Sequence, residues 1–315
     1  MIKIGKRITS VEIDDHYKAV NGYLTSSKTL RRKRTKMEKL VSNFSNNKFN
    51  LEHLIKADFK TISNDIVPLW DNFTDKDKRQ VQTVCKLFKR YYGYFTTDTY
   101  SVSKGSSLVA YNSNTMFNQL DIKVCPYCNE NYTYHFENGK RNFDLDHFYS
   151  QKDYPVLALT RYNLVPSCKE CNFYKRSSKD RLLSPYENYK VNDVIRWGIK
   201  IKSSRFLVDQ NEFTINVRFK SNLEDLKNIE NNISVLNLEE RYQQRNDLVI
   251  DMLRKKQIYN VDFINDLFRQ YEGTLFSTKS DVVSMIYNAS LKESEFSNRP
   301  FSKLLYDIFN DKKLP

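Results

Sequence analysis

The stretch CPYCNENYTYHFENGKRNFDLDHFYSQKDYPVLALTRYNLVPSCKECNFYK, residues 125–175, contains the residues that decide the predicted fold. Four of the five cysteines lie in it as two CxxC pairs, Cys125 with Cys128 and Cys168 with Cys171. A gap of two residues lets one tight turn present both thiolates to a single ion. Two such turns complete the tetrahedral sulfur site that structural zinc prefers. We therefore predict a structural Zn²⁺ site.

A redox site or chance burial would account less well for the two cysteine pairs. A thioredoxin-like redox site has a single pair within a βαβ pattern, and no such pattern surrounds these pairs. Chance burial of cysteines does not account for two pairs with the same gap. The fifth cysteine, Cys85, falls on the apolar face of a predicted helix, so we expect it in the core.

A short acidic segment with one histidine, DLDHF at residues 144–148, lies between the two cysteine pairs. In a strand, alternation puts Asp144 and Asp146 on one face and His147 on the other. A carboxylate can bind a hard cation, and a histidine can act as a base near neutral pH. For this segment alone, a hairpin with an inert, hydrogen-bonded histidine is the simpler interpretation.

The later segment YNLVPSCKECNFYK changes that balance, because the ordered set CxxC, DxDH, NLxPxC and CNxxK resembles the zinc-stapled HNH, or ββα-metal, endonucleases. The resemblance covers about residues 122–182. It implies a hairpin followed by a helix that together hold one divalent ion, Mg²⁺ or Mn²⁺, beside the scissile phosphate. The expected fold class is α+β: a ββα-metal HNH core stapled by a four-cysteine zinc site, with mainly helical N-terminal and C-terminal extensions and a small additional β-hairpin region.

The resemblance also implies a role for each matching residue. Asp146 and Asn172 would ligate the catalytic ion. Asp144 would not touch the ion but would contact the residues that ligate it. His147 would be the general base that activates water, and Asn163 would brace the loop that keeps this base oriented. Lys175 would counter charge on the phosphate.

The net charge of +13 is concentrated near the N-terminus. Residues 1–124 hold 22 Lys and Arg against 12 Asp and Glu, a net charge of +10. A predicted helix around residues 28–41 contributes the densest group, which we expect to bind nucleic-acid phosphates: Lys28, Arg31, Arg32, Lys33, Arg34 and Lys36. A solvated helix face is the alternative interpretation of this charge run.

The remaining sequence suggests three parts: a basic, mainly helical region at 1–121, the nuclease core at 122–185, and a β-hairpin plus helical region at 186–315. The polar stretch at 101–114 is predicted to be a loop, and an Asn-Gly pair at 138–139 predicts a hairpin turn. The segment RPFSKL at 299–304 fits either a phosphate-contacting turn or the start of a helix.

These features predict a metal-dependent HNH endonuclease that hydrolyses phosphodiester bonds, with DNA the favoured substrate. An RNA endonuclease, for example one that cleaves tRNA, and an inactive zinc-stapled binding module are the alternatives. The flanking sequence is similar to HNH effectors of bacterial anti-phage systems of the Septu type, which implies a co-encoded ATPase as a partner. A mean hydropathy of −0.66 and the lack of a signal-like or membrane-spanning segment lead us to expect a cytoplasmic protein.

Overall fold

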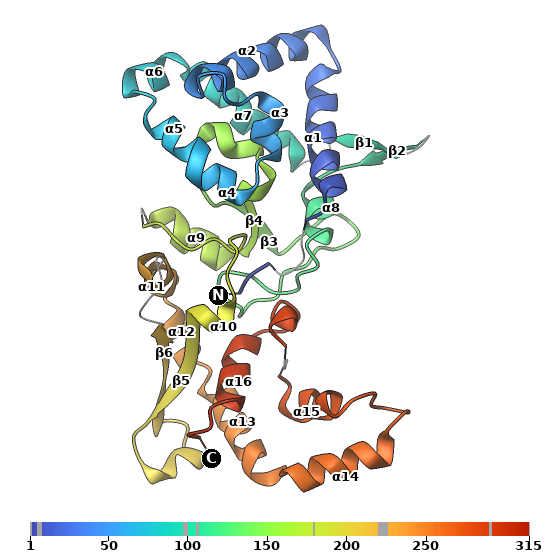
Figure 1. Cartoon of the computed structure of the whole chain (residues 1–315), viewed down its shortest axis with the longest axis vertical. Coiled ribbons are helices and arrows are strands. Elements are labelled where there is room, and N and C mark those ends of the chain that lie inside the picture. The colour runs from blue at the N-terminus through green and yellow to red at the C-terminus, as the bar shows by residue number, and fades with distance from the viewer. Residues whose placement is uncertain are drawn as a thin grey trace. The chain divides into compact units, whose positions relative to one another are not determined.

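The computed structural model describes residues 2–4, 8–96, 100–104, 107–178, 180–219, 226–289 and 292–314. This part of the chain is mostly helical and forms three two-stranded antiparallel sheets, so the predicted α+β class is confirmed. The chain folds as two compact units (Figure 1). We call Lys6–Ile122 with Thr133–Asn172 the N-terminal unit, and Met1–Gly5 with Lys123–Tyr132 and Phe173–Pro315 the C-terminal unit. The functional division at residues 122 and 186 stays a prediction.

The N-terminal unit is built mainly from short helices. Its helices are α1 (Ser10–Thr25), α2 (Lys28–Phe44), α3 (Leu51–Lys56), α4 (Phe59–Thr61), α5 (Val67–Asp71), α6 (Asp75–Gln80), α7 (Gln82–Phe95) and α8 (Ser113–Asn118). A π-helical turn, η1 (Ile62–Ile66), and two 3-10 turns, η2 (Pro155–Leu159) and η3 (Arg161–Asn163), complete its helical elements. Its strands are β1 (Ser101–Lys104), β2 (Ser107–Ala110), β3 (Phe143–His147) and β4 (Leu164–Cys168).

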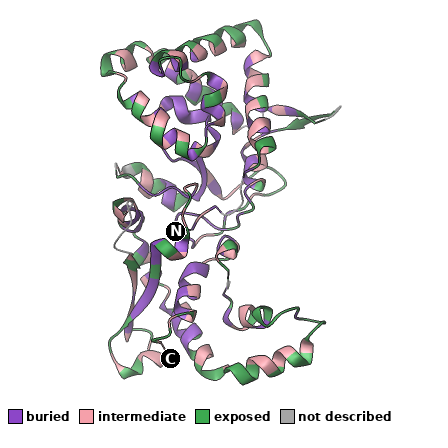
Figure 2. Cartoon of the chain, viewed as in Figure 1, coloured by how far each residue is buried: buried purple, intermediate pink, exposed green. Residues whose placement is uncertain are grey.

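The core of the N-terminal unit forms where α1, α2 and α7 turn their apolar faces inward. Leu24 of α1, Leu40 of α2 and Phe88 of α7 are almost completely buried. Thr9 and Glu12 form a reciprocal capping box at the start of α1, which satisfies backbone N–H groups that the helix leaves without partners. Figure 2 shows that the outer surface of α2 stays exposed while its inner residues are buried.

Strands β3 and β4 pair antiparallel, and α9 (Lys169–Ser177) follows β4 without a break. The connection between the strands, residues 148–163, contains η2 and η3 and is too long for a tight hairpin. Helix α7 packs against η2, so the connection is held within the unit. The chain therefore has a strand, strand and helix in the expected order.

The C-terminal unit contains one longer sheet surrounded by helices. After the end of α9, its elements are α10 (Val191–Val194), β5 (Ile195–Ile201), η4 (Ser204–Leu207), β6 (Phe213–Phe219), α11 (Leu226–Val235), α12 (Leu238–Gln243), α13 (Asn246–Ile258), α14 (Val261–Tyr271), α15 (Lys279–Tyr287), η5 (Glu293–Glu295) and α16 (Ser302–Phe309). Helix α16 packs on both β5 and α13. Trp197 of β5 stacks on Tyr242 of α12, with ring centroids 4.3 Å apart, at the centre of this core.

Two local predictions need correction. The stretch predicted to be a loop at 101–114 contains the β1–β2 hairpin, in which Val102 pairs with Val109. A turn at Asn138–Gly139 exists, since Gly139 has a φ of 82° and the Phe136 N–H donates to the Lys140 carbonyl. The runs beside it form only an isolated bridge, however, and β3 takes β4 as its partner instead.

The part of the chain that the structure describes has no helix both long and apolar enough to cross a membrane.

Candidate functional site

The four paired cysteines come together as predicted. The sulfur atoms of Cys125, Cys128, Cys168 and Cys171 all lie within 4.8 Å of one another, and each residue is buried. None of them forms a disulfide. Four buried thiols at this spacing match the donor set of a closed structural zinc site, whereas Mg²⁺ and Ca²⁺ require oxygen ligands. The chain therefore has a four-cysteine cluster that fits structural Zn²⁺.

Local backbone geometry shapes the first cysteine turn. The Asn129 N–H donates to the Cys125 carbonyl at 2.8 Å, and the Cys125 N–H donates to the Asn131 carbonyl at 2.8 Å. Asn129 has a left-handed φ of 54°, which asparagine tolerates better than most residues. The Glu130 N–H points at the Cys128 sulfur at 3.4 Å, an arrangement that favours a thiolate.

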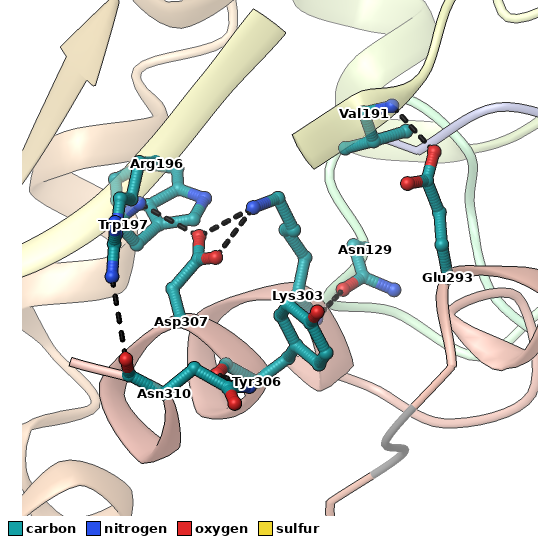
Figure 3. A network of polar contacts seen from close by, with 9 residues as sticks. All are labelled: Asn129, Val191, Arg196, Trp197, Glu293, Lys303, Tyr306, Asp307 and Asn310. Atoms are coloured by element: carbon teal, nitrogen blue, oxygen red, sulfur yellow. Dashed lines mark hydrogen bonds and ion pairs between the residues drawn. The ribbon is translucent and has the colours of Figure 1, made fainter. Parts of the chain in front are cut away.

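The side chain of Asn129 ties this turn to the segment that precedes and begins α16. Its Nδ2 donates to the Phe296 carbonyl at 2.9 Å. Its Oδ1 accepts from the Lys303 N–H at 3.1 Å (Figure 3). The Ser302 hydroxyl donates to the same Oδ1 at 3.2 Å. The Tyr242 hydroxyl donates to the Cys128 carbonyl. Sequence reasoning missed Asn129, because its partners lie more than 160 residues away.

Figure 3 also shows why the RPFSKL segment is structural. The Lys303 ammonium lies 2.6 Å from both carboxylate oxygens of Asp307, and both side chains are almost completely buried. Asp307 also accepts the Trp197 N–H at 2.8 Å. Burial lowers the pKa of Lys303 and raises the pKa of Asp307, while the opposite charge of each partner acts in the other direction. The segment therefore leads into a helix start, and the Lys303 ammonium is paired with Asp307 in the core.

The acidic segment forms strand β3 as its alternating pattern predicts. Asp144 lies opposite Ser167 of β4, and Asp146 lies opposite Val165. The Asn172 amide nitrogen on α9 donates to Asp144 at 2.7 Å, which joins the first turns of the helix to the strand. Because the amide nitrogen takes this bond, the Asn172 oxygen is directed elsewhere and keeps its lone pairs for another partner.

His147, the last residue of β3, is held through both ring nitrogens. Its Nε2 lies 3.1 Å from the Ala158 carbonyl, and its Nδ1 lies 2.8 Å from the Gln151 amide nitrogen. A carbonyl can only accept, so Nε2 carries the proton and Nδ1 keeps its lone pair. The Tyr92 ring of α7 meets the imidazole edge-to-face with a centroid distance of 4.3 Å. The imidazole is therefore fixed in the tautomer in which Nδ1 is the basic atom.

Asn163 organises the connection between β3 and β4. Its Nδ2 donates to the Tyr149 and Leu157 carbonyls, both at 3.1 Å, and its Oδ1 accepts the Tyr149 N–H at 2.7 Å. The side chain is completely buried. These bonds span the loop that carries Gln151 and the Ala158 carbonyl, the two groups that hold His147.

Lys175, the last of the predicted site residues, lies on α9. It follows Asn172 by three residues, which places the two on neighbouring positions of one helix face. Its side chain is partly exposed.

The predicted basic group lies on α2, which starts at the Ser27 cap. Its charged residues differ in exposure: Lys28, Arg31, Arg32 and Lys36 are exposed, whereas Lys33 and Arg34 are partly buried. Arg34 donates to the Asn21 side chain at 2.7 Å and pairs with Glu38 at 3.6 Å. Among the described residues, no carboxylate forms an ion pair with Lys28, Arg32 or Lys36.

Comparisons of the chain with protein-family models, with curated proteins and with solved structures find no match.

Gln151, Tyr92 and the Ala158 carbonyl are contacts of His147 that sequence reasoning missed. Gln151 follows His147 by only four residues, within a turn closed by the Tyr154 N–H and the Ser150 carbonyl. The Ala158 carbonyl is a backbone group that every residue type has, so the sequence cannot indicate it. Tyr92 comes from a different element, so its contact with His147 cannot be read from local sequence. Gln151 alone had a local signal, since a polar residue shortly after DxDH can fold back on the histidine.

Proposed function

We propose that this chain is a divalent-metal-dependent endonuclease of the ββα-metal type, with DNA as the favoured substrate. One observation supports the proposal most directly: His147 is fixed with a basic Nδ1 at the end of the strand that carries Asp144 and Asp146. A base beside carboxylate and amide ligands is what metal-assisted phosphodiester hydrolysis requires.

The oxygen donors fit a hard cation. Asp146 and the Asn172 oxygen would hold Mg²⁺ or Mn²⁺, and two protein ligands leave the remaining positions to water and phosphate, as Mg²⁺ prefers. Asp144 supports this arrangement by accepting the Asn172 amide hydrogen, which directs the amide oxygen away from itself. When bound, such an ion neutralises charge on the phosphate and the leaving oxygen.

In the proposed reaction, a water molecule replaces the Gln151 amide at Nδ1 of His147. Nδ1 then accepts a proton from this water while the water oxygen bonds to phosphorus. The bond from phosphorus to the bridging oxygen breaks, its electron pair leaves with that oxygen, and the oxygen takes up a proton from solvent water, so the chain is cut. The Ala158 carbonyl stabilises the resulting imidazolium through Nε2–H, and Asn163 keeps that carbonyl in place. Lys175 is proposed to counter charge on the phosphate.

The four-cysteine cluster and α2 have supporting roles in this proposal. A structural Zn²⁺ would join the turn before β3 to the β4–α9 junction, so it would keep the strand and helix ligands together. The exposed cations of α2 would bind the phosphate backbone. A role in phage defence and an ATPase partner are proposals that rest on the sequence resemblance alone.

Replacing the base tests the proposal. Supercoiled plasmid, single-stranded DNA and structured RNA are incubated with wild-type protein and with His147→Ala in Mg²⁺ or Mn²⁺, with and without any co-encoded ATPase. We expect wild-type cleavage to be at least about 100-fold faster, the lower range for loss of a general base. His135→Ala is the matched control, because His135 belongs to the same segment but contacts Asn118 instead.

Each substrate in this assay separates one alternative. Cleavage of RNA alone would identify the RNA endonuclease. If neither wild type nor His147→Ala cleaves any of the substrates, the result would instead favour an inactive zinc-stapled binding module.

A further inference from the structure

An open cavity of about 550 Å³ with a mixed polar and apolar lining lies in the N-terminal unit, between α1 and the β1–β2 hairpin. Helix α1 and the residue that follows it contribute Lys18, Gly22, Tyr23 and Ser26 to its lining. The hairpin contributes hydroxyl groups from Ser101 and Ser103. A volume of this size is within the range of small-molecule sites. Its lining combines one aromatic ring, hydroxyl groups and a cation with the aliphatic side chains of Val102 and Leu108.

Gly22 leaves part of this cavity open. Glycine inside a helix weakens it relative to alanine, so a helical glycine usually has a structural reason. The two usual reasons are close packing against a neighbour and a left-handed φ. Neither applies to Gly22, because a Cβ there would have nothing within 4 Å and its φ is not in the left-handed region. Gly22 is exposed and lines the cavity, so a larger side chain at this position has open space at the edge of the cavity.

Tyr23 is positioned by a group of other tyrosines. Its ring centroid lies 5.1 Å from that of Tyr100, 5.5 Å from that of Tyr94 and 6.0 Å from that of Tyr91. Tyr100 is itself buried and donates its hydroxyl to the Tyr91 carbonyl. Tyr23 remains only partly buried at the cavity. A partly exposed ring that neighbouring aromatic rings hold in place is a suitable surface for stacking a nucleobase.

Positively charged side chains lie at the edge of this cavity. Lys18 lines the cavity and is exposed. The Arg31 side chain of α2 donates from Nε to the Thr25 carbonyl at 2.8 Å, which brings its guanidinium to the end of α1 beside Ser26. Lys104 is close but engaged, since it pairs with Asp15 at 3.3 Å. A stacking surface next to phosphate-binding cations is the usual composition of sites for single-stranded nucleic acid.

We propose that this cavity binds one unpaired nucleotide of a nucleic-acid strand, with its base against Tyr23 and its phosphates toward Lys18 and Arg31. The proposal rests on the proposed nuclease function and deepens it, because it makes the substrate single-stranded or locally unpaired where it meets α1. A base inside a duplex is paired and stacked, and it reaches such a cavity only after leaving the helix.

Filling the cavity tests the proposal without touching the proposed active site. Binding of full-length protein to fluorescent single-stranded and duplex oligonucleotides of one sequence is measured by anisotropy. The buffer contains no Mg²⁺ and no chelator, so that cleavage is prevented and structural zinc is retained. Wild type should bind the single strand about tenfold more tightly than the duplex. Gly22→Leu should remove this preference, a loss of about tenfold, the scale of one base–aromatic stack.

Two control variants isolate the cavity from the helix. Gly22→Ala should keep the preference, because a methyl group leaves most of the space open. Gly93→Leu makes the same change in α7, where a Cβ also has nothing within 4 Å, and it should bind like wild type. A folded Gly22→Leu protein that keeps wild-type affinity for the single strand would overturn the proposal, as would an equal loss in Gly93→Leu.

A crosslinking measurement covers the case in which Gly22→Leu fails to fold. A single strand carrying 5-bromouracil is irradiated with wild-type protein, and the linked peptide is identified by mass spectrometry. Crosslinking at Tyr23 supports the proposal, and crosslinks confined to other regions refute it. Loss of cleavage in the plasmid assay would reject the nuclease while leaving these binding results interpretable, so the two failures are distinguishable.

Discussion

Two histidines contact consecutive carbonyl groups of η2 through the same ring nitrogen. His147 Nε2 lies 3.1 Å from the Ala158 carbonyl, and His16 Nε2 lies 2.8 Å from the Leu159 carbonyl. Their second nitrogens differ. His147 Nδ1 meets the Gln151 amide, whereas His16 Nδ1 is completely buried and has no hydrogen-bond partner among the described residues. Of these two histidines, His147 thus has its second ring nitrogen against a polar side chain, whereas that of His16 lies in the core.

His16 makes the stability of the fold depend on pH. Burial lowers its pKa to about 3, and the charge of Arg161 acts in the same direction. Below about pH 6.5, His16 is protonated in the unfolded chain but stays neutral in the folded chain. The free energy of unfolding therefore falls as the pH drops from about 6.5 toward 3, by about 1.4 kcal/mol per pH unit for this one group.

We expect His16→Phe to reduce this dependence. Phenylalanine keeps the edge contacts that the His16 ring makes with Phe95 and Tyr111, but it has no proton to gain. Urea unfolding at pH 7 and pH 5 should show a loss about 2 kcal/mol larger in wild type than in the variant. The exposed His53 supplies the control substitution, and equal losses in wild type and His16→Phe would contradict the assignment.

At the scale of elements, patterns that are local in the sequence were the predictable ones. Alternation in DLDHF predicted β3, and the β-hairpin expected within residues 186–315 is formed by β5 and β6. The β1–β2 hairpin was missed because its Ser-rich composition resembles a loop, and its apolar Leu108 and Val109 are exposed rather than buried. The Asn-Gly turn suggested a nearer partner for β3, whereas β3 pairs with β4 in the strand, strand and helix order that the resemblance implies.

Helix α2 offers a quantitative test of phosphate binding. Lys28, Arg32 and Lys36 are exposed, and replacing all three with Gln should lower the slope of log affinity against log salt by about 2 to 3 for duplex DNA. Anisotropy titrations between low and high salt measure this slope.

The chain also provides a matched control for α2. Lys200, Lys312 and Lys313 of the C-terminal unit are equally exposed, and their replacement with Gln removes the same net charge. An identical change in slope in both triple variants would show that net charge, not α2, governs the salt dependence.

At the scale of the whole molecule, the four-cysteine cluster is the strongest predicted feature. Zinc binding to such sites contributes on the order of 10 kcal/mol to folding. Metal analysis of purified wild type should give about one zinc per chain. Cys125→Ser should lose this zinc and unfold in large part, as followed by circular dichroism.

Cys85 supplies the matched control for the zinc site. It lies on α7, away from the two pairs in sequence, and burial raises the pKa of its thiol to about 11, so it remains a neutral core residue. Cys85→Ala should keep the full zinc content. A zinc-free wild type with an intact fold would refute the structural role of the cluster.

Most of the candidate site could be found from the sequence, but not the contacts that orient it. Cys125, His147 and Asn163 belong to short motifs whose spacing carries their chemistry. Gln151 and the Ala158 carbonyl have no such motif, because a turn and a backbone atom supply them. The tyrosines around Tyr23 come from one stretch, residues 91–100, which lies far from Tyr23 in the sequence and which only the fold brings beside it.

The bonds of Asn129 have a consequence for the order of folding. Its partners Phe296 and Lys303 lie 167 and 174 residues along the chain, so these bonds must close a very long loop. Long-range contacts form late because loop closure is entropically costly. The two CxxC pairs are separated by only 39 residues, so the four-cysteine site closes a much shorter loop and can take up zinc earlier. In refolding experiments, zinc uptake should therefore precede the packing of α16, and the metal would serve as the nucleus on which the later part of the chain assembles.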